Sequence, residues 1–241
     1  MAEVIKRSDN RDTESLRSIE IIPDFTKTKG GSVLINWGST RVLCTALLEE
    51  STMPFLKDTG KGWLTAEYAM LPSSTGSRKK RETSKPDGRS TEIKRLIGRS
   101  LRNAVDMEKL GENTIWIDCD VLQADGGTRT ASITGAYTAL RLGVQKWLKE
   151  GRISCDPLVH QIAAVSVGIV GDVPMLDLCY VEDSAADVDM NIVMNEAGEF
   201  IELQGTGEER SFTRAELSKL MELGEKGIKE IMEIQNRACA M

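Results

Sequence analysis

The stretch DCDVLQADGGTRTASIT, from Asp118 to Thr134, joins a strand-like run to a helix-forming run through two adjacent glycines. The run TIWIDCDVL alternates apolar and polar residues, which is typical of a strand with one buried face. The sequence after the glycines predicts a helix over about residues 130–150. We therefore expect a strand-to-helix unit whose sharp turn is made by Gly126 and Gly127.

This turn has the features of an anion-binding site. Glycines let backbone amides point together, and the N-terminus of the following helix adds partial positive charge. Thr128 and Thr130 offer hydroxyl groups, and Arg129 can bind a phosphate or carboxylate through two parallel hydrogen bonds. The spacings GxxxxGK[ST] and GxGxxG are both absent. A turn that has glycines for purely steric reasons is about as common, so both interpretations stay open here.

Periodicity in the rest of the chain predicts an α+β fold. No linker divides the sequence, so we expect a single domain over residues 1–241. The last helix is expected to begin at Thr213, because Glu216 follows at capping-box spacing. The other expected helix covers about residues 93–105, and the expected strands cover residues 18–22, 32–36, 40–48, 114–122, 161–170, 175–182, 188–194 and 200–203.

Composition limits the possible classes of protein. The chain has 241 residues with 40% hydrophobic content, and no apolar run approaches the ~20 residues of a membrane span. Its charged start lacks a signal-peptide core, and its five scattered cysteines contain no CxxC, so we expect a reducing cytoplasm. His160 is the only histidine and lies at the edge of an apolar strand. Chemistry is therefore expected from carboxylates, arginines, backbone amides and a hard metal ion.

The net charge of −6 is unevenly distributed. Residues 78–102 hold ten Lys/Arg and three Asp/Glu, a local balance of +7, which leaves −13 for the rest. This segment begins in a polar loop, SSTGSRKKRETSKPDG, and a basic loop on an acidic protein fits a polyanionic partner. We expect Arg78 and Arg81 to contact that polyanion; the alternative is a solvated tether.

A second group of polar residues lies in LDLCYVEDSAADVDMNIVMN. This sequence predicts a strand that ends at Glu182-Asp183, turns through three small residues and restarts at Val188-Asp189. Asp183 and Asp189 would then flank a hairpin-like turn and converge on one point. Paired carboxylates can hold Mg²⁺ or supply a general acid. The alternative is that one carboxylate caps the turn and the other is solvated.

Several segments together resemble the ribonuclease PH family: GSVLINWGSTRVLCTALLEE, GWLTAEYAMLP, EIKRLIGRSLR, IDCDVLQADGGTRTASITGA, VDMNIVMN and ELQGTGE. The resemblance runs nearly end to end. It implies a fold of the ribosomal protein S5 domain 2 type and a ring-shaped homohexamer built as a trimer of dimers. The implied activity is phosphate-dependent 3′-to-5′ trimming of transfer RNA precursors, with release of nucleoside 5′-diphosphates.

The resemblance also implies site residues. Inorganic phosphate, the co-substrate, is expected to be bound by residues of the GGTRT motif and of the GR(S/T)xEI motif: Gly127, Thr128, Arg129 and Arg89. Asp183 and Asp189 are expected to form the carboxylate centre that holds Mg²⁺.

The chain departs from the family pattern at three places. Asn10 stands where the family has glycine in DGR, residues 15–19 read SLRSI in place of ELRPI, and Ser73 replaces an arginine thought to grip RNA. These departures bear on the strength of transfer RNA binding.

Two other functions fit the sequence less well. A non-catalytic RNA-binding ring subunit would not need GGTRT and both aspartates, and a small-substrate enzyme such as a kinase would not need the +7 segment.

Overall fold

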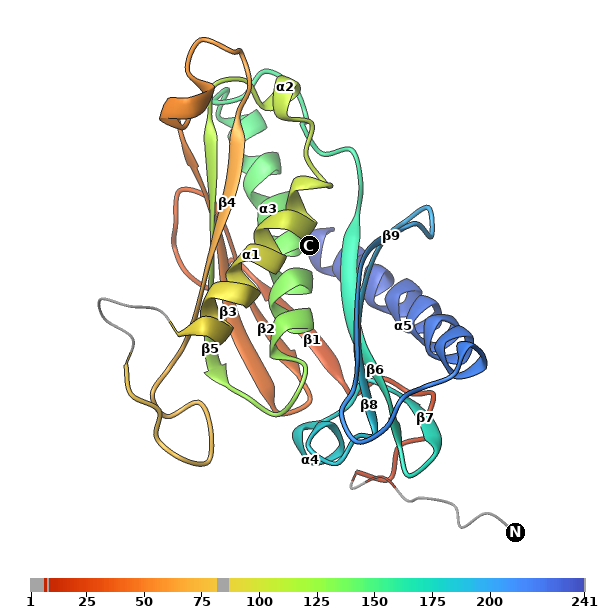
Figure 1. The fold of residues 1–241 in the computed structure, drawn as a ribbon. Coiled ribbons are helices and arrows are strands. Elements are labelled where there is room, and N and C mark those ends of the chain that lie inside the picture. Colours follow the sequence, from red (N-terminus) through yellow and green to blue (C-terminus); the bar gives the residue numbers. More distant parts are fainter. Residues whose placement is uncertain (1–6, 8, 82–86, 241) are drawn as a thin grey trace.

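The structure, a computed structural model, describes residue 7 and residues 9–81 and 87–240. Two β-sheets form its frame (Figure 1). The first sheet has the order β1-β2-β3-β5-β4, in which only the β4–β5 pair is parallel. Its strands are β1 (Ile19–Pro23), β2 (Gly31–Trp37), β3 (Thr40–Glu49), β4 (Trp63–Met70) and β5 (Thr114–Gln123).

The second sheet is antiparallel throughout, in the order β7-β6-β8-β9. Its strands are β6 (Ile162–Val170), β7 (Val173–Leu176), β8 (Val188–Asn195) and β9 (Phe200–Gly207). The helices are η1 (Pro54–Leu56), α1 (Gly88–Arg102), α2 (Met107–Leu110), α3 (Thr128–Lys149), α4 (Tyr180–Asp183) and α5 (Arg214–Cys239). None of the helices in the described part of the chain is long and apolar enough to cross a membrane.

Helix α3 lies between the two sheets and packs on β2, β3 and β6. Small residues let it approach the first sheet closely. A Cβ on Gly135 would lie 2.8 Å from Cys44 Sγ, and a Cβ on Gly31 would lie 1.7 Å from the Ala139 carbonyl oxygen. Because backbone meets backbone here, the position of α3, and of the turn that precedes it, is closely fixed by packing.

One hydrophobic core joins both sheets. It includes Val33 of β2, Ile133 of α3, Val165 of β6 and Ile231 of α5, all fully buried. Strand β6 is buried on both faces except at its last residue, because α3 and α5 both pack against it. The shared core supports a single domain, which stays a prediction.

Strand β4 is not among the strands expected from the sequence. Strand β4 has the two-residue period of a half-buried strand, with Leu64, Ala66 and Tyr68 buried. Its parallel pairing with β5 places it next to a strand that lies far along the chain. The alternation of apolar and polar residues is present in GWLTAEYAML, so this strand is predictable from the sequence alone.

The expected strand over residues 175–182 is wrong in its second half. Strand β7 ends at Leu176, and residues 180–183 form the short helix α4. Asp177 breaks the strand because its φ of 58° lies in the left-handed region. The Glu182 carboxylate then accepts a hydrogen bond from the Cys179 backbone N–H at 3.0 Å and starts the helix. Asp183 and Asp189 therefore do not flank a β-hairpin.

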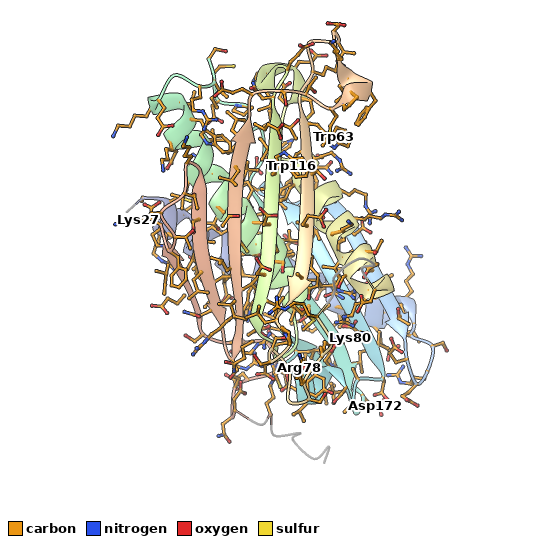
Figure 2. All side chains as sticks on the ribbon, turned by 90° about the vertical axis from the view of Figure 1, so that its left-hand side faces the viewer. Lys27, Trp63, Arg78, Lys80, Trp116 and Asp172 are labelled. Carbon is orange, nitrogen blue, oxygen red and sulfur yellow. The ribbon has the colours of Figure 1, made fainter. Side chains whose placement is uncertain are left out.

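The outer face of the first sheet carries no helix in the described part of the chain (Figure 2). Apolar side chains form cross-strand pairs on this face. Leu34 pairs with Leu43, and Leu47 pairs with Trp116. These four side chains are only partly buried or exposed, unlike their neighbours on the core side.

Candidate active site

The predicted phosphate-binding and carboxylate residues gather at one end of the molecule, where the two sheets meet (Figure 1). The turn between β5 and α3, the first residues of α1, and α4 all lie at this end. Asp189 joins them from β8, next to Gly168 of β6 and Thr206 of β9. Residues from both sheets thus contribute to one site.

The turn between β5 and α3 requires both of its glycines. Gly126 has φ of 73° and Gly127 has φ of 64°. A Cβ on Gly126 would lie 2.7 Å from the Leu178 carbonyl oxygen, so only glycine lets the turn pack against the start of α4. The Thr40 hydroxyl holds the turn from the opposite side, because it donates to the Gly126 carbonyl at 2.7 Å and accepts from the Asp125 N–H at 2.9 Å.

The N-terminus of α3 faces this turn with its amide groups. No side chain caps this helix, so its first N–H groups have no side-chain acceptor. Thr128 is buried, and its hydroxyl accepts a hydrogen bond from the Tyr68 hydroxyl at 3.0 Å. Since that oxygen already accepts, the Thr128 proton is available to donate to an anion.

Arg129 is held by two residues that sequence reasoning missed. Its Nη1 donates to Gln204 Oε1 at 3.3 Å, and its Nη2 lies 3.4 Å from Glu92 Oε2. Gln204 in turn donates to Glu92 Oε1 at 3.2 Å. These partners come from β9 and α1 and fix the direction of the Arg129 side chain. Both stand in motifs quoted above, EIKRLIGRSLR and ELQGTGE, and the polarity of these positions was the available signal.

Arg89 lies in the first turn of α1 and is exposed, with no hydrogen-bond partner among the described residues. Its charge nevertheless reaches the carboxylates. Burial raises the pKa of Asp183, while the charges of Arg89, Arg129 and Arg17 oppose that rise. The structure therefore brings the predicted phosphate-binding arginines within electrostatic range of the predicted carboxylate centre.

Asp183 and Asp189 interact as a pair. Burial raises the pKa of Asp189 to about 6, and the nearby negative charge of Asp183 adds to the rise. Both side chains are partly buried, and Glu208 contributes further negative charge to both. A pair of carboxylate oxygen donors suits a hard cation such as Mg²⁺. No group of three His, Cys, Asp or Glu among the described residues could hold a metal alone, so water or phosphate oxygens would complete the shell.

The N-terminal segment contacts the residues that precede α4. Arg11 and Arg17 both bind Asp177, the residue that breaks β7 before α4. Asn10, where the family has glycine, has φ of 60°, a conformation that asparagine tolerates better than most residues. This departure is thus accommodated by the backbone. Nothing in the sequence pattern pairs residues near position 17 with residues near position 177.

The basic segment divides into a loop and a helix. Arg78, Arg81 and Ser73 are exposed and lie in the segment 71–81 that follows β4. This segment lies at the same end of the molecule as α4 (Figure 1), and Figure 2 labels Arg78 there. The helical part forms one wall of a cleft of about 340 Å³ between α1 and β4. Four cations line it: Lys94, Arg95, Arg99 and Arg102. His160 has no part in this site. It lies on the surface, where its Nδ1 is 3.1 Å from Glu196 Oε1.

Two models of the 3′ exoribonuclease family match this chain, domain 1 over residues 15–143 and domain 2 over residues 160–227. The chain belongs to this family. Ribonuclease PH of Syntrophomonas wolfei is 55% identical over 96% of this chain and 98% of its own length. Ribonuclease PH of Bacillus pumilus is 56% identical over 95% of this chain and 96% of its own length. The family resemblance and the exoribonuclease class expected from the sequence are confirmed.

Solved structures of two other proteins share the fold. A chain of the Archaeoglobus fulgidus exosome with RNA bound to the active site has a TM-score of 0.80 at 23% identity, over 95% of this chain and 92% of that chain. Rice Rrp46 has a TM-score of 0.79 at 17% identity, over 98% of this chain and 100% of that chain. The expected α+β fold class is therefore confirmed, while the individual site residues stay predictions.

Proposed function

We propose that this protein shortens RNA, including transfer RNA precursors, from the 3′ end by using inorganic phosphate as the attacking group. The similarity to ribonuclease PH over nearly the full chain supports a phosphorolytic 3′ exoribonuclease. The observation that carries the assignment of the site is the meeting of two arginines with two coupled carboxylates, at the uncapped N-terminus of α3. Five free cysteines support a reducing cytoplasm as its location.

The phosphate-binding part of the site would solve a problem of charge. Inorganic phosphate must approach a phosphodiester that is also an anion, and the two repel each other. The amides of α3, the Thr128 hydroxyl, Arg129 and Arg89 would hold the attacking phosphate and offset its charge. Fixing the attacker in line with the scissile bond replaces a bimolecular encounter by a positioned one.

The carboxylate pair would serve the leaving group. A phosphate oxygen bonds to the phosphorus of the terminal nucleotide while the bond from phosphorus to the 3′ oxygen breaks. That oxygen needs a proton, and one of the two carboxyls, Asp183 or Asp189, whose burial raises both pKa values, would supply it. The products are a nucleoside 5′-diphosphate and an RNA one nucleotide shorter. Asp183 and Asp189 would also hold Mg²⁺, which when bound would neutralise charge on the scissile phosphate.

One assay tests this function directly. RNA labelled at its 3′-terminal nucleotide is incubated with the protein and a divalent cation, with and without inorganic phosphate. We expect labelled nucleoside 5′-diphosphate only when phosphate is present. Release of nucleoside monophosphate in the absence of phosphate would show that the protein hydrolyses RNA and does not phosphorolyse it. RNA binding without release of any nucleotide would favour the non-catalytic ring subunit.

We further propose that the loop carrying Arg78 and Arg81 binds the RNA backbone. Neutralising both residues should flatten the dependence of log K on log salt by roughly one to two units, because each lost phosphate contact removes about 0.7 on single strands and about 0.9 on duplex. Titration of one transfer RNA precursor and one short oligonucleotide at several salt concentrations measures both slopes. Unaltered slopes in the double variant would leave the loop as a solvated tether.

We propose a homohexameric ring, a trimer of dimers, as the assembly. The similarity of the fold to an exosome chain and the helix-free outer face of the first sheet, with its Leu47–Trp116 pair, support it. Sedimentation velocity should show a particle of about six chains, and Leu47→Asp should shift it to smaller species because a charge would be buried at a contact. A wild-type protein that sediments as a fully active monomer would contradict the ring.

A further inference from the structure

Arg17 and Asp177 form a buried ion pair next to the candidate active site. Arg17 Nη2 donates to Asp177 Oδ1 at 2.6 Å, and Arg17 Nε donates to both carboxylate oxygens at 3.1 Å. The Arg17 backbone N–H and Trp37 Nε1 also donate to Oδ2, at 2.7 and 2.9 Å. Arg17 is 6% exposed and Asp177 is 1% exposed. Because both side chains are buried and already bonded, neither is placed to bind substrate itself.

Asp177 connects this pair to the carboxylate side of the site. It lies directly between β7 and α4, the helix that ends in Asp183. Its left-handed backbone, with φ of 58°, is uncommon outside glycine, although aspartate adopts it more readily than most residues. At this residue the side chain is bonded by Arg17 and Trp37. The ion pair therefore helps to hold the chain in place where it enters α4, together with Arg7 and Arg11, which donate to the Asp177 backbone oxygen.

Arg17 connects the same pair to the phosphate side. Its remaining nitrogen, Nη1, donates to the Asp125 backbone oxygen at 2.5 Å. Asp125 precedes the two glycines of the β5–α3 turn, and Arg17 Nη2 lies 3.1 Å from the position of a Cβ on Gly127. The guanidinium group of Arg17 therefore lies against the turn that is expected to bind phosphate.

The turn and α4 also contact each other directly. Asp125 Oδ1 accepts a hydrogen bond from the Tyr180 N–H at 3.3 Å, at the first residue of α4. Gly126 packs against the Leu178 and Cys179 backbone. Together with Arg17, these contacts join the phosphate-binding turn of one sheet to the carboxylate helix of the other sheet.

We propose that Arg17 is a positioning residue: it fixes the phosphate-binding turn against α4 and so aligns the attacking phosphate with the carboxylate pair. In-line attack depends on the alignment of the reacting groups, and small displacements are costly. The proposal rests on the proposed function, because it assigns Arg17 a part in that reaction.

Arg17→Lys separates this role from the stability of the fold. A guanidinium group can bind a carboxylate with two nitrogens and still offer the third to Asp125, whereas lysine has a single nitrogen. The variant thus keeps a cation against Asp177 but loses the tether to the turn. We expect its KM for phosphate to rise about tenfold or more, because the turn loses a charge-assisted hydrogen bond. Its kcat should also fall, while KM for RNA should stay within about twofold.

Arg152→Lys is the matched control. Arg152 also spans a carboxylate and a backbone carbonyl, with Nε 2.8 Å from Glu50 Oε1 and Nη2 3.0 Å from the Leu48 oxygen. It follows the C-terminal end of α3, far from the site. The same chemical change there should leave both KM values and kcat unaltered. Thermal unfolding of each variant, without phosphate, reports stability separately.

Thr40→Val provides a second test should Arg17→Lys fold poorly. This change removes the hydroxyl that holds the other side of the turn and leaves the Arg17–Asp177 pair in place. KM for phosphate should again rise more than KM for RNA. A lower melting temperature with unchanged KM for phosphate in both variants would overturn the proposal and leave Arg17 a purely structural residue. A wild-type protein that releases no nucleoside diphosphate would instead contradict the proposed function.

Discussion

Arg129→Ala should nearly abolish phosphate-dependent release of nucleotides while the fold stays intact. Losing one charge-assisted contact to phosphate costs about 1.5–3 kcal/mol in binding, and loss of orientation adds to this in the rate. We therefore expect kcat/KM for phosphate to fall roughly 10²- to 10⁴-fold. The measurement is steady-state kinetics with phosphate varied at saturating RNA.

Two further variants make this test specific. Arg129→Lys keeps the charge but not the planar fork, so it should recover only part of the lost activity. Arg141→Ala removes an exposed arginine from the same helix, more than three turns further along, and should behave as wild type. An Arg129→Ala protein with normal turnover and unaltered dependence on phosphate would remove the GGTRT motif from the phosphate site.

The sequence predicted what is local along the chain. The alternation in TIWIDCDVL, the two glycines and the helix that follows lie within one continuous stretch, and β5, the turn and α3 form as expected. The capping box of Thr213 and Glu216 likewise marks the start of α5. In these segments the residues that decide the conformation are near neighbours, so periodicity and turn chemistry are sufficient.

The sequence failed where distant segments decide the conformation. Residues 175–182 have the apolar character of a strand, but the chain turns at Asp177, whose backbone is left-handed and whose carboxylate is bound by Arg17, 160 positions away. The direction of Arg129 depends on Glu92 and Gln204, which come from two other elements. No rule of spacing pairs such residues, so these contacts came only from the three-dimensional structure.

Asp183→Asn and Asp189→Asn should each lose most activity yet still bind RNA. The pair is expected to supply a proton and to hold Mg²⁺, and removing a general acid costs roughly 10²- to 10⁴-fold in rate. RNA affinity should change little, since the loop residues that we expect to bind RNA lie elsewhere. Single-turnover trimming and a filter-binding measurement across a range of Mg²⁺ concentrations separate the two effects. A variant that trims at the wild-type rate would exclude that carboxylate from the site.

Asp189→Asn should also raise the free energy of unfolding near neutral pH. The pKa of Asp189 is raised to about 6 in the folded state, mainly by burial and then by Asp183, above the usual value near 4. The folded state therefore binds this proton more tightly than the unfolded state, so the free energy of unfolding falls as pH rises from about 4 to about 6. Above that range the charged carboxylate lowers the free energy of unfolding by roughly 1–3 kcal/mol. Asp189→Asn removes this loss.

Thermal unfolding without divalent cations at pH 7.5 and at pH 4 measures this effect. The melting temperature of Asp189→Asn should exceed that of wild type at pH 7.5, and the difference should shrink toward pH 4, where Asp189 is protonated in the folded state and about half protonated in the unfolded state. Asp172→Asn is the control, because Asp172 is an exposed carboxylate whose side chain is 88% accessible. A stable but inactive Asp189→Asn protein would show that the site keeps this buried charge for function at a cost in stability. Equal melting temperatures at both pH values would mean that Asp189 is solvated in solution, and its place in a coupled, proton-holding pair would be lost.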